Sequence, residues 1–438
     1  MPLLFVLIGI LILFILIAGF KLNAFISFII VCLFVGITGG MELTSIISSI
    51  QVGMGNTLGY LVMILGLGAM LGKLVADSGA AQRITTRLVS SFGIKNVQWA
   101  VVLAGFIVGI PMFYTVGFVI LIPLVFTVAV TTGLPLIYVG LPMLASLSVT
   151  HGFLPPHPAP TAIAQMFEAD IAKTLLFGII IAIPTIIVAG PLLTRRLKKV
   201  DATPLKAFYN PIILKDNEMP SFGISVFSAL LPVILIGFST LVLSFIPENV
   251  TYRKAFEFIG NPSIAMLISV LVAIYTLGLS QGKKMKELMD SVSKGVTGIT
   301  MVLLIIGGAG ALKQVLVDSG VSEYIGELMK GSTISPLILA WLIAGVIRVC
   351  VGSATVAGMT AGGIMLPVVS ITGASPELMV IAIGAGSLML SHVNDGGFWL
   401  FKEYFNLTVK ETLSTWTVME TTVGVMGIIG VLILNLFV

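Results

Sequence analysis

The chain has 438 residues, of which 57% are hydrophobic and only 10% are charged, with a formal net charge of +4. Soluble domains carry about a quarter charged residues, so this composition excludes a soluble protein of this length. The surplus lysines and arginines lie in loops between apolar runs, where they report membrane topology and not nucleic-acid binding.

Apolar runs recur along the whole chain. Each has roughly the length that a bilayer span requires, about 20 residues, or is a fused or broken version of one. The runs lie at 2–20, 24–39, 58–72, 99–131, 174–193, 222–246, 262–280, 297–312, 336–351, 364–391 and 415–438. They predict an all-α polytopic protein, multi-pass in the cell (inner) membrane. Cys32 and Cys350 are both in apolar sequence and indicate neither a disulfide framework nor a metal site.

Two halves of the chain carry the same motifs at the same spacing. Asp77-Ser78-Gly79 precedes His151 by the same number of residues as Asp318-Ser319-Gly320 precedes His392. Trp99 and Trp341 correspond within one residue of the same offset. These matches predict two repeats of one unit, and they divide the chain into five segments. These are N-terminal membrane helices at 1–56, a first repeat at 57–193, a linker at 194–220, connecting helices at 221–296 and a second repeat at 297–438.

Basic residues orient the two repeats. Clusters that begin at Arg195 and at Lys283 lie in loops, and the positive-inside rule assigns both to the cytoplasm. Counting spans from these clusters puts Asp77 inside and Asp318 outside. Equivalent motifs on opposite faces predict two inverted repeats, an arrangement that many alternating-access transporters share.

Each repeat contains two interruptions. Residues 109–117 and 348–358 break long apolar stretches with small and polar residues, which predicts re-entrant hairpins at about 98–131 and about 336–372. Irregular backbone at membrane depth is tolerated only where protein or a water-filled cavity covers it. Second breaks are expected at 151–161, which holds four prolines, and at 391–398. Because proline lacks an N–H donor, we expect unwound helices whose free amides could hold an anion or a proton.

Ionisable side chains concentrate at these interruptions. All three histidines of the chain lie in the two breaks, and histidine is the side chain that titrates near neutrality. Arg348 is an intramembrane charge, which is usually functional, although a structural ion pair with Asp395 is an alternative. The candidates for proton coupling are His151, His157, His392 and Asp395. Asp77 and Asp318 are more typical of turns and helix caps.

Four strings resemble the gluconate permease family of proton symporters, within the broader ion-transporter superfamily. They are Thr150–Pro158 (THGFLPPHP), Leu71–Gly79, Gly352–Ala357 and Ser391–Asp395, and the likeness runs along the whole chain. The resemblance implies proton symport of gluconate or a related sugar acid or small hydroxy-carboxylate, without a cofactor. It also implies a homodimer with scaffold and transport domains and an elevator-like movement of the hairpin-bearing part.

A sugar acid presents one carboxylate and several hydroxyls, so its site needs a cation or aligned amides together with polar side chains. We expect this site to be one cavity near the bilayer midplane. The candidate substrate-binding residues are Tyr114, Thr115, Pro156, His157, Thr161, Arg348, Ser353, Thr355, His392 and Asn394.

Other functions remain open at this point. The runner-up is a carrier of another small carboxylate or of a D-amino acid such as D-serine. A channel and an integral membrane enzyme are weaker alternatives, and the sequence has no HExxH metal motif and no Walker sequence. The partners expected are the carboxylate substrate, protons, the lipid bilayer and a second copy of the chain, with no nucleic acid or metal.

Overall fold

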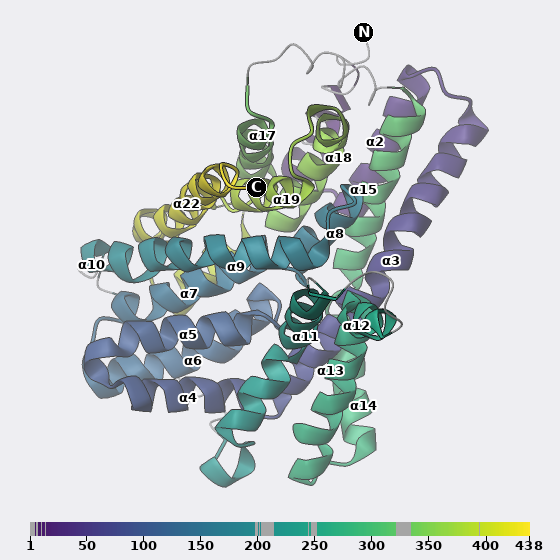
Figure 1. Ribbon diagram of the computed structural model, residues 1–438. Helices are drawn as coiled ribbons and strands as arrows, with labels where there is room; N and C mark the ends of the chain where they lie inside the picture. The colour runs from purple at the N-terminus through teal and green to yellow at the C-terminus, as the bar shows by residue number, and fades with distance from the viewer. Residues whose placement is uncertain are drawn as a thin grey trace.

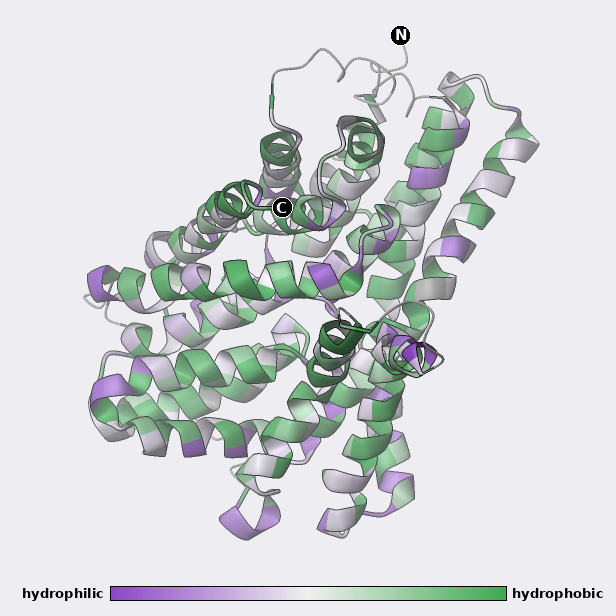
Figure 2. Ribbon diagram, viewed as in Figure 1, coloured by the Kyte–Doolittle hydropathy of each residue, from purple (hydrophilic) through white to green (hydrophobic). Residues whose placement is uncertain are grey.

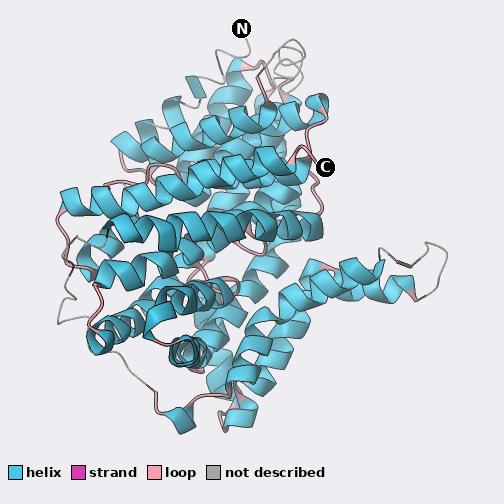
Figure 3. Cartoon of the chain, turned by 60° about the vertical axis from the view of Figure 1, so that its left-hand side comes forward, coloured by secondary structure: helices cyan, strands magenta, loops and turns pink. Residues whose placement is uncertain are grey.

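The computed structural model describes residues 5, 8, 9, 11–13, 15–197, 200, 202, 214–243, 245, 246, 252–320, 334–393 and 395–438. Throughout these residues the chain is helical, with connecting loops and no strand (Figure 3). The prediction of an all-α polytopic fold is confirmed at this level. Six described helices are long and apolar enough to cross a membrane, or up to eight if each bent pair is one span.

The helices before the linker run from α2 to α10. Their bounds are α2 (Ala24–Thr38), α3 (Leu43–Asp77), α4 (Ala80–Phe92), α5 (Val97–Gly109), α6 (Tyr114–Thr132), α7 (Leu136–Phe153), α8 (Pro158–Met166), α9 (Ile171–Ile187) and α10 (Leu193–Leu197). Short 3₁₀ or π turns occupy η1 (Ile15–Gly19), η2 (Ile94–Asn96) and η3 (Val188–Leu192).

The remaining helices run from α11 to α22. Their bounds are α11 (Phe222–Leu243), α12 (Arg253–Gly260), α13 (Pro262–Thr276), α14 (Met285–Thr297), α15 (Thr300–Asp318), α17 (Pro336–Val351), α18 (Ala354–Thr372), α19 (Pro376–Gly386), α20 (Gly396–Tyr404), α21 (Val409–Thr412) and α22 (Val418–Leu434). Short turns occupy η5 (Asp216–Glu218), η6 (Leu279–Gln281) and η7 (Leu413–Thr417).

Hydropathy follows this architecture. In Figure 2 the helices are mostly hydrophobic along their length, and hydrophilic residues gather at helix ends, on α12 and along one side of α4. Several helices begin at a residue whose side chain accepts hydrogen bonds from the first-turn amides, or at a proline in the first helical position. Asn23 accepts hydrogen bonds from the backbone N–H groups of Phe25 and Ile26, and Asn261 accepts one from that of Ser263. Each cap satisfies amide groups that have no partner within the helix.

Element lengths recur between the two halves of the chain. Helices α6 and α18 each have 19 residues and end at a glycine in the left-handed conformation, Gly133 or Gly373. Helices α8 and α20 each have 9 residues. Helix α3 bends by 44° at Gly59–Leu61, and the corresponding stretch of the second half is divided into α14 and α15.

The helices form two groups in space (Figure 1). Helices α4 to α7 and α9 pack together and are joined by α17 to α19 and α22, whereas α2, α3 and α13 to α15 form a second group, with α11 between them. In the second group α3 and α15 cross so closely that only glycine fits at position 53. A Cβ on Gly53 would lie 2.4 Å from the Gly310 carbonyl oxygen. Helix α14 meets α3 in the same way at Gly295, where a Cβ would lie 2.7 Å from the Ala69 oxygen.

Polar contacts at the ends of these helices are reciprocal. Ser49 Oγ of α3 donates to Asp318 Oδ2 at the end of α15, at 2.5 Å. Ser291 Oγ of α14 donates to Asp77 Oδ2 at the end of α3, at 2.6 Å. Each aspartate thus receives a serine hydroxyl from the other half of the chain.

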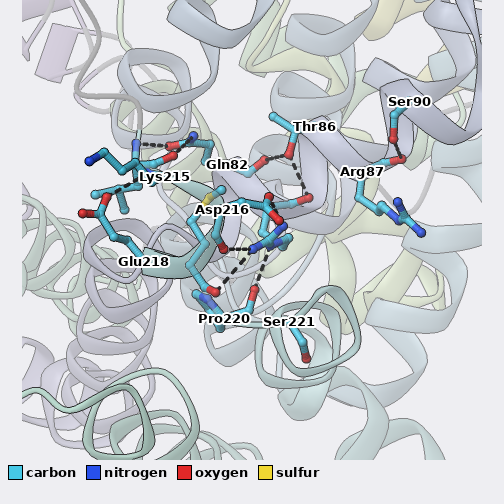
Figure 4. Close-up of polar contacts among 12 residues, drawn as sticks. Gln82, Thr86, Arg87, Ser90, Lys215, Asp216, Glu218, Pro220 and Ser221 are labelled. Carbon is cyan, nitrogen blue, oxygen red and sulfur yellow. Dashed lines mark hydrogen bonds and ion pairs between the residues drawn. The ribbon is translucent and has the colours of Figure 1, made fainter.

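The described end of the linker docks on α4. Figure 4 shows Gln82 of α4 beside Lys215, with Asp216 and Pro220 of the same segment close by. Gln82 Nε2 donates to the Leu214 carbonyl at 3.0 Å, and Arg83 Nε donates to the Pro220 carbonyl at 2.9 Å. Arg83 also forms an ion pair with Asp216. These bonds tie the chain that leads into α11 to the first group of helices.

Candidate functional site

A cavity of about 750 Å³ lies where the two groups of helices meet. It is lined by parts of both halves of the chain, including the tips of both helix hairpins. The lining residues are Ala69, Gly72, Lys73, Met112, Phe113, Tyr114, Thr115, Val116, Ser148, His151, Pro158, Lys294, Gly295, Gly298, Ile299, Val302, Arg348, Gly352, Ser353, Ala354, Thr355, Leu388, Asp395, Gly396, Gly397, Leu400, Trp416 and Glu420.

Four helices begin at this cavity. The first residues of α6, α8, α18 and α20 all belong to its wall, namely Tyr114, Pro158, Ala354 and Gly396. The N-terminus of a helix carries partial positive charge and amide N–H groups without partners in the helix. Four such ends around one cavity favour an anion through their partial positive charge, while in α8 the prolines 158 and 160 supply no N–H.

The breaks in the sequence produce these helix starts. Helix α7 ends at Phe153 and α8 begins at Pro158, so Pro155 and Pro156 lie between helices. The predicted break at 151–161 is longer than the observed interruption, because prolines 158 and 160 fit the first turn of α8. Proline is tolerated there, since the N–H it lacks would have no partner in the helix.

The second hairpin turns at Gly352. This residue has φ of +76°, a conformation that glycine adopts without strain, and it ends α17 with its N–H bonded to the Arg348 carbonyl at 2.9 Å. Ser353 then caps α18 by accepting a hydrogen bond from the Val356 N–H at 3.3 Å. The tight turn brings Ser353 and Thr355 to the cavity wall beside the last turn of α17.

Arg348 and Asp395 form a buried ion pair on this wall. Arg348 Nη2 bonds Asp395 Oδ2, and their side chains are 4% and 15% exposed. The guanidinium Nε and Nη1 atoms are buried and have no hydrogen-bond partner among the described residues. A buried donor without a partner is costly. Arg348 therefore holds Asp395 through Nη2, and its Nε and Nη1 are donors that make no bond to the described residues.

Further hydrogen bonds fix Asp395. It caps α20 by accepting from the Gly397 N–H at 2.9 Å, and it accepts a hydrogen bond from the Ser391 hydroxyl. Trp416 Nε1 in turn donates to Ser391 Oγ at 2.8 Å. This network orients the carboxylate and hence the arginine that it holds.

The three histidines have different surroundings. His157 Nε2 donates to the Gly109 carbonyl at 2.8 Å, and His392 Nε2 donates to the Val349 carbonyl at the same distance. Each bond satisfies a carbonyl in the last turn of the first helix of a hairpin. His151 alone lines the cavity, and its buried Nδ1 has no partner among the residues that the structure describes.

The cavity wall includes Tyr114, Thr115, His151, Arg348, Ser353, Thr355 and Asp395 of the predicted residues. Pro156, His157, Thr161 and His392 stand behind it. His157 contacts His151, with ring centroids 5.3 Å apart, and Thr161 Oγ1 donates to the His157 carbonyl at 2.6 Å. Asn394 lies outside the described residues.

The structure adds residues that sequence reasoning missed. Glu420 of α22 and Ser148 of α7 line the cavity and are hydrogen-bonded to each other. Lys73 and Lys294 lie at its edge on α3 and α14. Glu420 is an acid within the apolar run 415–438, and an intramembrane carboxyl is a signal of function that could have found it.

The whole chain resembles known permeases. Residues 1–437 match the family described as GntP family permease. The chain is 53% identical over 435 residues to the Gnt-II system L-idonate transporter of Escherichia coli, covering 99% of both chains. It is 53% identical over 436 residues to a high-affinity gluconate transporter of the same organism, covering 100% of both.

A solved structure shares the fold. The YdaH transporter of Alcanivorax borkumensis superposes with a TM-score of 0.67 at 16% identity, covering 94% of this chain and 96% of that one. At this identity the likeness concerns the fold alone. The family match and the two relatives confirm the resemblance seen in the sequence: the chain belongs to the GntP permease family and is a multi-pass inner-membrane transporter, not an enzyme.

Proposed function

We propose that the protein takes up gluconate or a related sugar acid by proton symport with alternating access. The observation that carries this proposal is the convergence on one cavity of four helix N-termini and of Arg348, whose Nε and Nη1 make no bond to the described residues. A carboxylate is the anion that such a site suits, because guanidinium donors match its two oxygens. The relatives named for gluconate and L-idonate transport support the same substrate class.

Different residues of the cavity wall would bind different groups of the substrate. Arg348 and the start of α18 at Ser353 would bind the carboxylate. Tyr114, Thr115 and Thr355 would bind hydroxyls, because each lines the cavity and carries a hydroxyl that both donates and accepts. Pro156, His157, Thr161 and His392 would act from behind the wall by holding the helix breaks in shape.

Alternating access would follow from the two groups of helices. The recurring element lengths and the reciprocal serine–aspartate bonds support two inverted repeats, at 57–193 and 297–438. In this proposal α2, α3 and α11 to α15 form the scaffold, and the hairpins with α7 to α9 and α19 to α22 form the transport domain. The working unit would be a homodimer that moves protons together with the substrate.

One observation favours a second substrate class. Asp395 and Glu420 both lie on the wall that holds Arg348. A carboxylate acceptor beside a guanidinium could hold the ammonium and carboxylate of an amino acid together. A carrier of D-amino acids or of another small carboxylate is therefore the alternative.

Uptake by purified protein in liposomes tests both proposals. Labelled gluconate should accumulate when the outside is acidic, and a protonophore should abolish accumulation while a sodium gradient has no effect. Unlabelled aldonates should compete better than D-serine. Accumulation that needs sodium and survives the protonophore would contradict proton symport, and stronger competition by D-serine would favour the alternative.

A further inference from the structure

Among the described residues of the cavity wall, Glu420 is the one buried acid that has no countercharge bonded to it. Its residue exposure is 2%, and it lies in the first turn of α22, after Met419 and before Thr421. Ser148 Oγ donates to Oε1, whereas Oε2 is buried and has no hydrogen-bond partner among the described residues. Asp395, by contrast, is bonded to Arg348, Ser391 and a backbone N–H.

A carboxylate in such a place is hard to keep ionised permanently. Each oxygen that leaves water needs a partner, and Oε2 has none within the described part of the chain. A proton on Oε2 removes the charge and turns that oxygen into a hydrogen-bond donor. The π turn at Leu413–Thr417 comes just before Glu420, and such turns recur at functional sites.

The groups around Glu420 link its proton to the substrate. The described charges that act on it are Arg348 from α17 and Asp395 from the break before α20, and His151 and Tyr114 line the same wall from α7 and α6. Arg348 supplies a single positive charge, and Asp395 already balances it. With a substrate carboxylate bound, the net charge of Arg348, Asp395, Glu420 and the substrate is therefore −2 when Glu420 is ionised and −1 when Glu420 is protonated.

We propose that Glu420 carries the proton that is transported with the substrate. The proton binds Oε2 from the water of the outward-facing cavity, which favours binding of the substrate anion beside Arg348. After the cavity opens to the cytoplasm the proton and the anion both leave to water. Because binding linkage is reciprocal, the substrate also favours protonation of Glu420. This assignment rests on the proposed symport.

Glu420→Gln tests the assignment, because glutamine keeps the size and one oxygen for Ser148 but cannot exchange a proton. Purified protein in liposomes is assayed twice with gluconate. We expect the gluconate-induced alkalinisation of the medium to disappear and the accumulation ratio under an acid-outside gradient to fall to about one. Exchange of internal unlabelled for external labelled gluconate should persist, since exchange needs no net proton movement.

Control variants separate the outcomes. Glu257→Gln removes an acid on α12 that is 50% exposed and pairs with Arg253, and it should behave as wild type. Glu420→Asp retains a carboxyl and should keep alkalinisation even if the glutamine variant fails to assemble. Alkalinisation that survives Glu420→Gln, or Glu420→Asp that exchanges gluconate without alkalinisation, overturns the assignment. If the wild type itself moves no protons with gluconate, the symport proposal fails, and the role of Glu420 fails with it.

Discussion

The two hairpin tips are alike in geometry and unlike in chemistry. Helices α6 and α18 have the same length and begin at the same cavity. The first tip brings Met112, Phe113 and Tyr114 to the wall, whereas the second brings Arg348 and Ser353. The two breaks therefore bring two hairpin tips to one cavity, and the residues at each tip decide which part of a substrate that tip recognises.

Two histidines at different places in the repeat teach the converse, since His392 corresponds in sequence to His151. His157 and His392 make the same bond to the end of a hairpin helix, at the same 2.8 Å. What the halves share is thus support of the breaks. What they do not share, Arg348 with Asp395 in one and Tyr114 with His151 in the other, is where recognition of a substrate is expected.

The largest effect should come from the charged tip. Arg348→Ala removes the free donors and leaves Asp395 buried without its partner, which costs about 3–5 kcal/mol for a buried pair. Arg348→Lys should also transport poorly, because an ammonium cannot replace two donors of a planar fork. Labelled gluconate uptake, with membrane content measured by immunoblot, checks this. Uptake by the alanine variant near that of wild type would contradict a role of Arg348 in binding.

The aromatic tip should affect hydroxyl recognition and leave carboxylate recognition intact. Tyr114→Phe should raise KM for gluconate by about tenfold, which corresponds to about 1.4 kcal/mol and is of the order of one hydrogen bond. Competition by lactate, which has a single hydroxyl, should change less. Tyr252→Phe, at an exposed position before α12, is the matched control. Equal changes for gluconate and lactate would show that the two tips do not divide the substrate.

The sequence was sufficient to predict the helical class and the family. Helices α17 and α18 together span 336–372, because Pro336 and Gly373 mark the ends and small residues mark the turn. The re-entrant character of the two hairpins stays a prediction. Boundaries at the breaks were less accurate. Proline both interrupts α7 and starts α8, so composition alone does not separate the gap from the first helical turn.

The site was predictable in part. Arg348 and Asp395 stand out as charges in apolar sequence, and their pairing was foreseen as an alternative. The sequence could not tell which histidine faces the cavity, because His151 and His157 are separated by a break whose direction depends on packing. Glu420 was missed although it carries the same signal as Arg348. Its neighbour Ser148 is 272 positions away in the chain, so only the fold reveals the contact.

The histidines should separate into structural and functional members. His157→Ala and His392→Ala each leave a hairpin carbonyl without its donor, so each should lower stability by a similar amount, about 1–3 kcal/mol. His151→Asn should reduce gluconate uptake with little change in stability, since its Nδ1 makes no bond to the described protein. Thermal unfolding in detergent and uptake in liposomes measure the two effects. An unfolding midpoint that drops for His151→Asn alone would reverse the assignment.

The smallest effect should test the equivalence of the halves directly. Ser49→Ala and Ser291→Ala each remove one hydroxyl from an aspartate that keeps another partner, Gln314 for Asp318 and Lys73 for Asp77. Because the acceptors are exposed and remain bonded, each loss should be about 0.5–1 kcal/mol. Similar falls in the unfolding midpoint, additive in the double variant, are expected if the two contacts are equivalent and independent. Ser90→Ala, which removes only a bond within α4, sets the baseline. A fall confined to one of the two serines would mean that the reciprocal bonds do not reflect equivalent packing of the halves.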